Sequence, residues 1–148
     1  MLDTDITGDR PGVGRVIYER VYNGTGSTIT SGSWVRLAGQ STTNNIPYIT
    51  LSDATTYANS QVSGYVSNSI VNGAYGYVYL EGIVLNANTA PYANGDILYL
   101  TSTAGIVSNT APTNSPLATL QVGKVVVGGS STTGSIVAQK GAHKFEVT

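Results

Sequence analysis

Residues 74–85 read Ala-Tyr-Gly-Tyr-Val-Tyr-Leu-Glu-Gly-Ile-Val-Leu, and this stretch decides the fold. Side chains point alternately to the two faces of a β-strand, so Tyr75, Tyr77 and Tyr79 share one face. The smaller and aliphatic residues between them share the other. Alternation over residues 75–80 within this run predicts a long β-strand that carries a stripe of tyrosines.

Similar segments recur along the chain roughly every ten to fifteen residues, with Gly, Asn, Ser or Thr at the breaks. Asn-Gly pairs at 23–24, 72–73 and 94–95 predict tight hairpin turns. No segment of ten residues carries a helical stripe, although residues 53–60 could form one helical turn. This spacing predicts an all-β fold, a single compact β-sandwich or barrel-like domain of short antiparallel strands. The other expected strands are 15–22, 33–37, 46–51, 61–66, 97–100, 117–127 and 135–139.

Charged residues make up only 10% of the 148 residues, against roughly 25% in an average soluble protein. Their place is taken by 18 Gly, 34 Ser plus Thr, 11 Asn and 10 Tyr. With no Cys, one His and a net charge of −1, the composition excludes disulfide scaffolds and Cys/His zinc sites. It argues against a nucleic-acid partner as well. Apolar runs of about three or four residues predict neither a membrane span nor a secretory signal.

The charges gather towards the two ends of the chain. Eight of the fifteen lie in residues 1–36 and four in residues 124–148, while the 87 residues between hold three. Interface cores are poor in charge and rich in Tyr, so this distribution favours packing against other proteins. We expect an extended N-terminal arm over 1–14, a β-rich domain over 15–139 and a short C-terminal tail over 140–148.

Groups that could support catalysis are few. His143, the only histidine, lies in the expected tail, where nothing orients a general base. Glu81 and Asp96 could approach each other across strands, but a glycosidase also needs a cleft with aromatic platforms around such a pair. Asp96 follows an Asn-Gly turn and is expected to accept hydrogen bonds from nearby backbone N–H groups. We predict that the protein is not an enzyme and has no cofactor.

Residues 3–9 resemble the opening half of a calcium loop, with Asp3, Asp5 and Asp9 at alternating positions and Gly8 at the sixth. The twelfth position is Gly14, where such a loop needs a bidentate Glu. An acidic terminal segment without a metal is the favoured interpretation. Cation binding by the three aspartates is left open.

The tyrosine stripe has three interpretations. Three amphipathic rings on one face suit packing against another subunit, which we rank first, or cross-strand packing within the domain. Sugar binding is the third. Stacking on nucleic-acid bases is disfavoured because the interleaved Arg and Lys residues are missing. The expected capsid or subunit interface comprises Asp9, Arg10, Arg15, Arg20, Tyr75, Tyr77 and Tyr79.

Residues 20–138 resemble a recurrent domain of tailed-phage virion proteins, in which one stretch reads N-x-T-G-S-T-I-x-x-G-x-x-V. Residues 23–35 fit this pattern, from Asn23 through Gly32 to Val35. Further residues of the family pattern follow in the same order along the chain. They are Gly39, Leu51-Ser52-Asp53-Ala54, Val62, Gly64, Val66, Gly76, Gly82, Gly95 to Leu100, Gly105, Pro112, Val122 to Val125 and Gly134 to Val137.

This resemblance implies a structural, non-enzymatic role as a capsid decoration (cement) or head-fibre protein. It implies the major capsid protein as partner, a homotrimer, and a place on the capsid surface after assembly in the host cytoplasm. The low charge and the short apolar runs predict no nucleic acid and no membrane as further partners. Two alternatives stay open. One is a tail or baseplate structural module of the same virion. The other is a carbohydrate-binding module that uses Tyr75, Tyr77 and Tyr79, with Trp34 as a further ring.

Overall fold

The computed structural model describes residues 16–113, 118–139 and 143–145. Within these ranges the regular structure is entirely β, with ten strands and no helix. The strands are β1 (Ile17–Asn23), β2 (Trp34–Gln40), β3 (Pro47–Leu51), β4 (Gly64–Tyr65), β5 (Tyr75–Ala87), β6 (Ile97–Leu100), β7 (Val107–Ser108), β8 (Ala118–Val127), β9 (Gly134–Ala138) and β10 (His143–Phe145).

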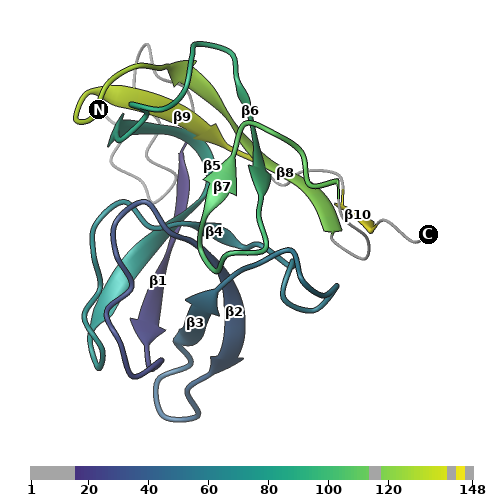
Figure 1. Ribbon diagram of the computed structural model, residues 1–148. Helices are drawn as coiled ribbons and strands as arrows, with labels where there is room; N and C mark the ends of the chain where they lie inside the picture. The colour runs from purple at the N-terminus through teal and green to yellow at the C-terminus, as the bar shows by residue number, and fades with distance from the viewer. Residues whose placement is uncertain (1–15, 114–117, 140–142, 146–148) are drawn as a thin grey trace.

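Five strands close into a barrel in the order β1-β3-β2-β4-β5. The closing pair is antiparallel and joins β1 to the first half of β5, with Tyr18 opposite Tyr79 and Tyr22 opposite Tyr75. The barrel occupies the lower half of Figure 1. One pair, β1 with β3, is parallel, whereas the sequence predicted only antiparallel strands. A closed barrel leaves its member strands without open edges along the paired lengths.

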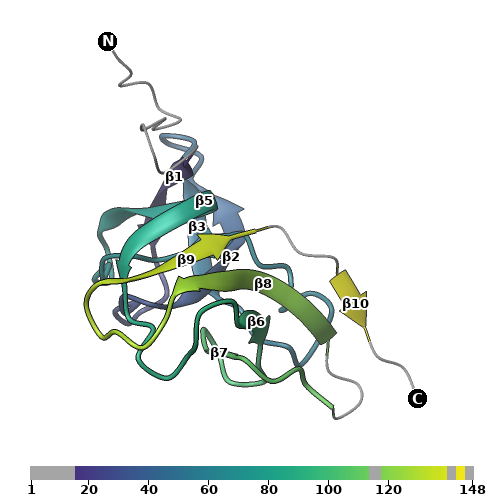
Figure 2. The ribbon, with the colours of Figure 1, turned by 90° about the horizontal axis from the view of Figure 1, so that it is seen from above.

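The second half of β5 leaves the barrel and becomes part of a second sheet. There it pairs with β9, which pairs with β8, followed by β6 and β7. Figure 2 shows β5, β9 and β8 running side by side. The short strand β10 pairs with the beginning of β8. The long strand predicted at 74–85 is therefore the element that joins the two halves of the domain.

The molecule has two hydrophobic cores that meet at β2. Trp34 and Val35 are neighbours on this strand and point to opposite faces, so each enters a different core. The barrel core holds Val21, Ile29, Val35, Ile49, Val66, Ile70 and Val78. The core between barrel and second sheet holds Trp34, Ala54, Tyr65, Val84, Ala87, Leu98, Leu100, Leu120, Val122, Val125, Ile136 and Ala138.

The all-β fold class is confirmed, and the expected strands coincide with observed ones to within a few residues. The prediction of tight hairpins at the Asn-Gly pairs is wrong. Asn23-Gly24 and Asn94-Gly95 do not form hairpins, because β1 does not pair with β2 and β5 does not pair with β6. Asn72-Gly73 forms a turn within the long connection between β4 and β5. Residues 53–60 contain a single turn of helical type, closed by a hydrogen bond from the Ser60 N–H to the Thr56 carbonyl.

The expected arm at 1–14 lies outside the described residues. The expected tail contains β10, which the sequence did not predict. In the described part of the chain no helix is present that could cross a membrane.

Candidate functional site: a tyrosine face and its groove

Strands β1, β3 and β5 place six tyrosines and one arginine side by side on the outside of the barrel. The strand register sets Tyr22 between Tyr48 and Tyr75, and Arg20 opposite Tyr77. Directly opposed side chains on neighbouring strands share a face and touch. We call this surface the tyrosine face. Its members are Tyr18, Tyr22, Tyr48, Tyr75, Tyr77 and Tyr79, together with Arg20.

The rings of the tyrosine face contact one another edge to face or in tilted pairs. Tyr18 lies 5.7 Å from Tyr77 and 6.2 Å from Tyr79, measured between ring centroids. Tyr22 lies 5.3 Å from Tyr48 and 5.1 Å from Tyr75. These are favourable aromatic geometries, so the rings restrict one another's rotamers. The face is therefore ordered before any partner arrives.

Arg20 and Asn44 hold Tyr75 from two sides. The Arg20 guanidinium carbon lies 4.5 Å from the centre of the Tyr75 ring, which is a cation–π distance. The Asn44 amide donates a hydrogen bond of 2.8 Å to the Tyr75 hydroxyl. Of the three arginines expected at the interface, Arg20 is thus already engaged with a ring of the face.

The residues between the tyrosines anchor the face to the barrel. Val78 and Val21 are fully buried in the barrel core. Gly76 leaves room for Ile70, because a Cβ at this position would come within 2.5 Å of the Ile70 side chain. The alternation predicted at 74–85 is confirmed: rings point outwards while Gly76 and Val78 point into the barrel.

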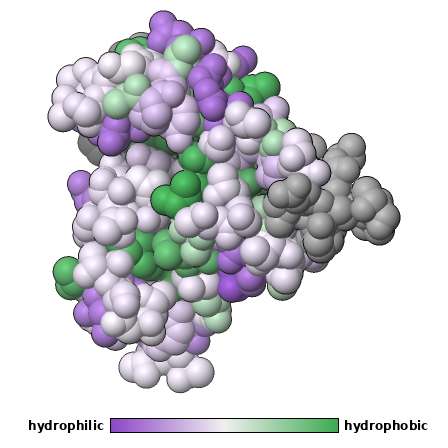
Figure 3. Space-filling view, in the orientation of Figure 1, coloured by the Kyte–Doolittle hydropathy of each residue, from purple (hydrophilic) through white to green (hydrophobic). Residues whose placement is uncertain are grey.

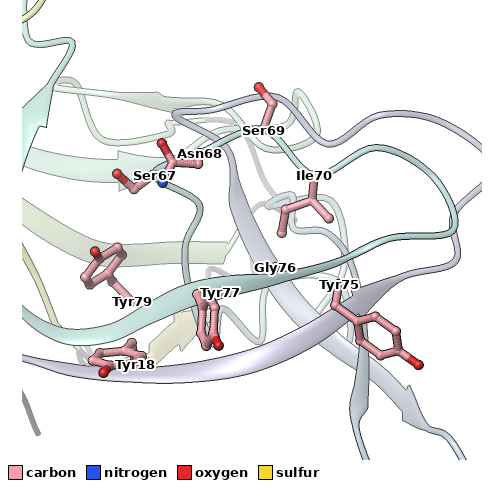
Figure 4. A pocket seen from close by; sticks show the side chains of 9 residues that line it. All are labelled: Tyr18, Ser67, Asn68, Ser69, Ile70, Tyr75, Gly76, Tyr77 and Tyr79. Carbon is pink, nitrogen blue, oxygen red and sulfur yellow. The ribbon is translucent and has the colours of Figure 1, made fainter. Parts of the chain in front are cut away.

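A groove of about 300 Å³ runs along one end of the tyrosine face. Figure 4 shows Tyr18, Tyr77 and Tyr79 on one side and the segment 67–69, which precedes β5, on the other. We call this the tyrosine groove. Its lining residues are Tyr18, Ser67, Asn68, Ser69, Ile70, Tyr75, Gly76, Tyr77 and Tyr79.

The polar side of the groove offers free hydrogen-bonding groups. Within the described residues, the side chains of Asn68 and Ser67 make no hydrogen bond, and Ser69 uses its hydroxyl to accept one from the Ser31 N–H at 2.9 Å. The Asn68 amide can both donate and accept. None of the nine lining residues carries a charge.

A second depression, of about 590 Å³, lies at the other end of the tyrosine face, beside Tyr22 and Tyr48. Its charged residue is Arg36, which donates a hydrogen bond of 3.1 Å to Asn59. Asn59 also donates to the carboxylate of Asp53. Burial raises the pKa of Asp53, but hydrogen bonds from Thr55 and Asn59 and the charge of Arg36 outweigh it and lower the pKa. Arg36 therefore belongs to a structural network.

The outcomes at the other candidate residues are mixed. Trp34 is buried in the core between barrel and sheet, at 1% exposure, so its suggested role as a sugar platform is wrong. Asp96 accepts a hydrogen bond from the backbone N–H of Ala93 at 3.0 Å, as predicted. That bond and one from Asn109 lower the Asp96 pKa.

Several candidate residues cannot be placed. Asp3, Asp5, Asp9, Arg10 and Arg15 lie outside the described residues, as does the side chain of His143. Among the residues that are described, no cluster of three His, Cys, Asp or Glu could hold a metal ion. The interface role of Arg20, Tyr75, Tyr77 and Tyr79 stays a prediction, although the structure places all four on one face.

The sequence could not reveal the tyrosine groove. Residues 67–69 lack a motif, and only the barrel topology brings them opposite Tyr77 and Tyr79. On the face seen in Figure 3, apolar residues gather between the barrel and the second sheet, and the rest of the surface is mostly near neutral in hydropathy.

No family model matches the sequence, and no curated protein does. Among solved structures, the head fibre N base of bacteriophage phi29 is similar, with a TM-score of 0.46 and 16% sequence identity. The similarity covers 89% of this chain and 99% of that one.

Proposed function

We propose that this protein is a structural protein of a tailed-phage virion, namely a capsid decoration protein that binds the outside of the assembled head as a homotrimer. One observation carries the proposal. Several residues through which the sequence resembles virion domains occupy positions where this fold tolerates few other residues. A resemblance carried by such positions supports a shared architecture more strongly than a similarity of composition would.

The start of the resembling series illustrates this. Asn23 is fully buried, and its amide donates to the carbonyls of Ser27 at 2.8 Å and Ile70 at 2.7 Å. Gly32 and Gly95 have φ values of 92° and 86°, a region that L-residues with a side chain rarely adopt.

The later glycines of the series lie where two backbones meet. A Cβ on Gly123 would come within 2.5 Å of the Val137 carbonyl oxygen, and one on Gly64 within 2.7 Å of the Tyr79 carbonyl oxygen. A Cβ on Gly134 would overlap the Thr89 hydroxyl. Substitution at any of the three would force backbone to move.

Decoration is a task that a small, rigid, low-charge domain can perform without catalysis. A protein that binds the assembled lattice and not the free subunits stabilises the lattice by linkage. Many identical copies multiply the effect. We place the capsid contact at the N-terminal end of the chain, from residue 1 to Arg20, which holds three of the four arginines.

Deletion of residues 1–14 tests this assignment. Because β1 starts at Ile17 and Val16 is already buried, the shortened chain should keep its circular dichroism spectrum and melting temperature. Its occupancy on purified heads should fall several-fold. Unchanged occupancy would overturn the assigned contact, and a copy number of only dozens per particle would instead favour a tail or baseplate module.

A further inference from the structure

We infer that the tyrosine groove is a binding site for a neutral saccharide, a role that goes beyond decoration and does not depend on it. Two features of the groove point to this ligand. Aromatic rings lie on one side of it, and uncharged polar side chains lie on the other.

The aromatic side suits the apolar faces of a sugar ring. Tyr77 is 53% exposed and Tyr18 is 38% exposed, so both rings offer surface to a ligand while touching each other. An ordered ring loses little conformational freedom on binding. Stacking of CH groups on such rings buries apolar area without any charge on the ligand.

The polar side suits sugar hydroxyls, which donate and accept hydrogen bonds. Asn68 has one acceptor and two donors on its amide, and none is used within the described part of the chain. Ser67 adds a hydroxyl that is equally free there. In Figure 4 both side chains stand across the groove from the ring of Tyr79. A ligand held there would contact aromatic and polar groups at once.

The charge and size of the groove narrow the ligand class. No lining residue is charged, and Arg20, which contacts the lining residue Tyr75, is already engaged with that ring. An acidic glycan would lose hydration in the groove without gaining an ionic partner among the lining residues. The volume of about 300 Å³ is at the lower end of the range for small-molecule sites. It fits a short unit of an oligosaccharide.

The experiment uses the full-length chain on an array of neutral and sialylated glycans, followed by calorimetric titration of the neutral oligosaccharide that binds best. Tyr77→Ala should lower the affinity about tenfold or more, which is the loss of about 1.4 kcal/mol. Tyr77→Phe keeps the ring and should stay within about threefold of the original affinity. Asn68→Ala should lower it about fivefold, by removing hydrogen bonds to the sugar.

Tyr57→Ala is the matched control, because Tyr57 is an exposed tyrosine outside the groove. Its saccharide affinity should be unchanged. Circular dichroism of each variant separates loss of binding from loss of fold.

Three results would overturn the inference. They are no binding to any neutral glycan, equal binding to sialylated glycans, or an affinity that Tyr77→Ala leaves intact. Light scattering adds a fourth: if Tyr77→Ala converts a particle of about 46 kDa, three times the 15.3 kDa chain, into monomers, the face is a subunit interface. Capsid occupancy is measured separately, so failure of decoration and failure of saccharide binding remain distinguishable.

Discussion

Asn23 shows how a single polar side chain organises the entry to the barrel. It is fully buried and satisfied on both sides, since its amide donates to two carbonyls and its oxygen accepts from the N–H and the hydroxyl of Thr25 at 3.0 and 2.8 Å. One of those carbonyls belongs to Ile70, which is 47 positions away in sequence. The loop after β1 is thereby fixed to the segment that precedes β5.

Replacing Asn23 by Ala should destabilise the protein by about 1–3 kcal/mol, because it removes the four hydrogen bonds of a fully buried side chain. Asn23→Asp has the same size but presents oxygens to the carbonyls of Ser27 and Ile70, and it should cost more at pH 7. Urea denaturation measures both variants. A loss no larger than that of Thr28→Ala, which removes an exposed hydroxyl outside this network, would contradict the assigned role.

The lowered pKa of Asp96 predicts that the stability of the folded protein depends on pH. The Asp96 pKa is lowered in the folded state by hydrogen bonds from Ala93 and Asn109. A lowered folded-state pKa contributes stability above the unfolded value of about 3.9, and this contribution is lost as the pH falls through that value and below. The melting temperature of Asp96→Asn should therefore differ from that of the unmodified protein more at pH 7 than at pH 2.5. A difference independent of pH would contradict the prediction.

At the scale of elements, Gly123 determines how closely β8 approaches β9 and the core. A Cβ there would meet the Val137 carbonyl oxygen at 2.5 Å and the Trp34 ring at 3.2 Å. Gly123→Ala should cost about 1–3 kcal/mol, as overpacking of cores does, and should shift the emission of Trp34. Lys124→Ala, the exposed neighbouring position, should stay within about 0.5 kcal/mol. Equal urea midpoints for the two variants would contradict the role assigned to Gly123 in the close packing of β8.

Alternation and turn residues predicted which segments form strands but not how the strands pair. The period of two in residues 74–85 is local information, so β5 and its tyrosine stripe followed from it. Pairing between β1 and β3 depends on contacts between distant segments, and no local pattern encodes a parallel pair. The short strands β7 and β10 carry too few residues to show alternation.

The same limit applies to the candidate site. Tyr75, Tyr77 and Tyr79 were predictable because they alternate on one strand. Tyr18, Tyr22 and Tyr48 join them only through the barrel register, and residues 67–69 only through the fold of the preceding loop. The burial of Trp34 could not be predicted from the sequence. Both faces of β2 are covered, and the sequence of a strand that is buried on both faces does not show the alternation that would mark one face as exposed.

At the scale of the whole molecule, the two cores share strands. The 13-residue strand β5 runs from the barrel into the second sheet, and adjacent residues of β2 point into the two cores. Neither half can lose its packing without disturbing a strand of the other. We therefore expect the domain to unfold in one cooperative transition.

The single tryptophan and the tyrosines serve as spectroscopic probes of whether the domain unfolds in one cooperative transition. Trp34 reports on the core between barrel and sheet, and the near-ultraviolet dichroism, to which six of the ten tyrosines contribute from the tyrosine face, also reports on the barrel wall. Val35→Ala removes packing from the barrel core alone, at a cost of about 2 kcal/mol. In urea both signals should shift to the same lower midpoint. If the Trp34 transition keeps its midpoint while the tyrosine signal moves, the two halves fold independently, because the shared strands then fail to transmit the loss.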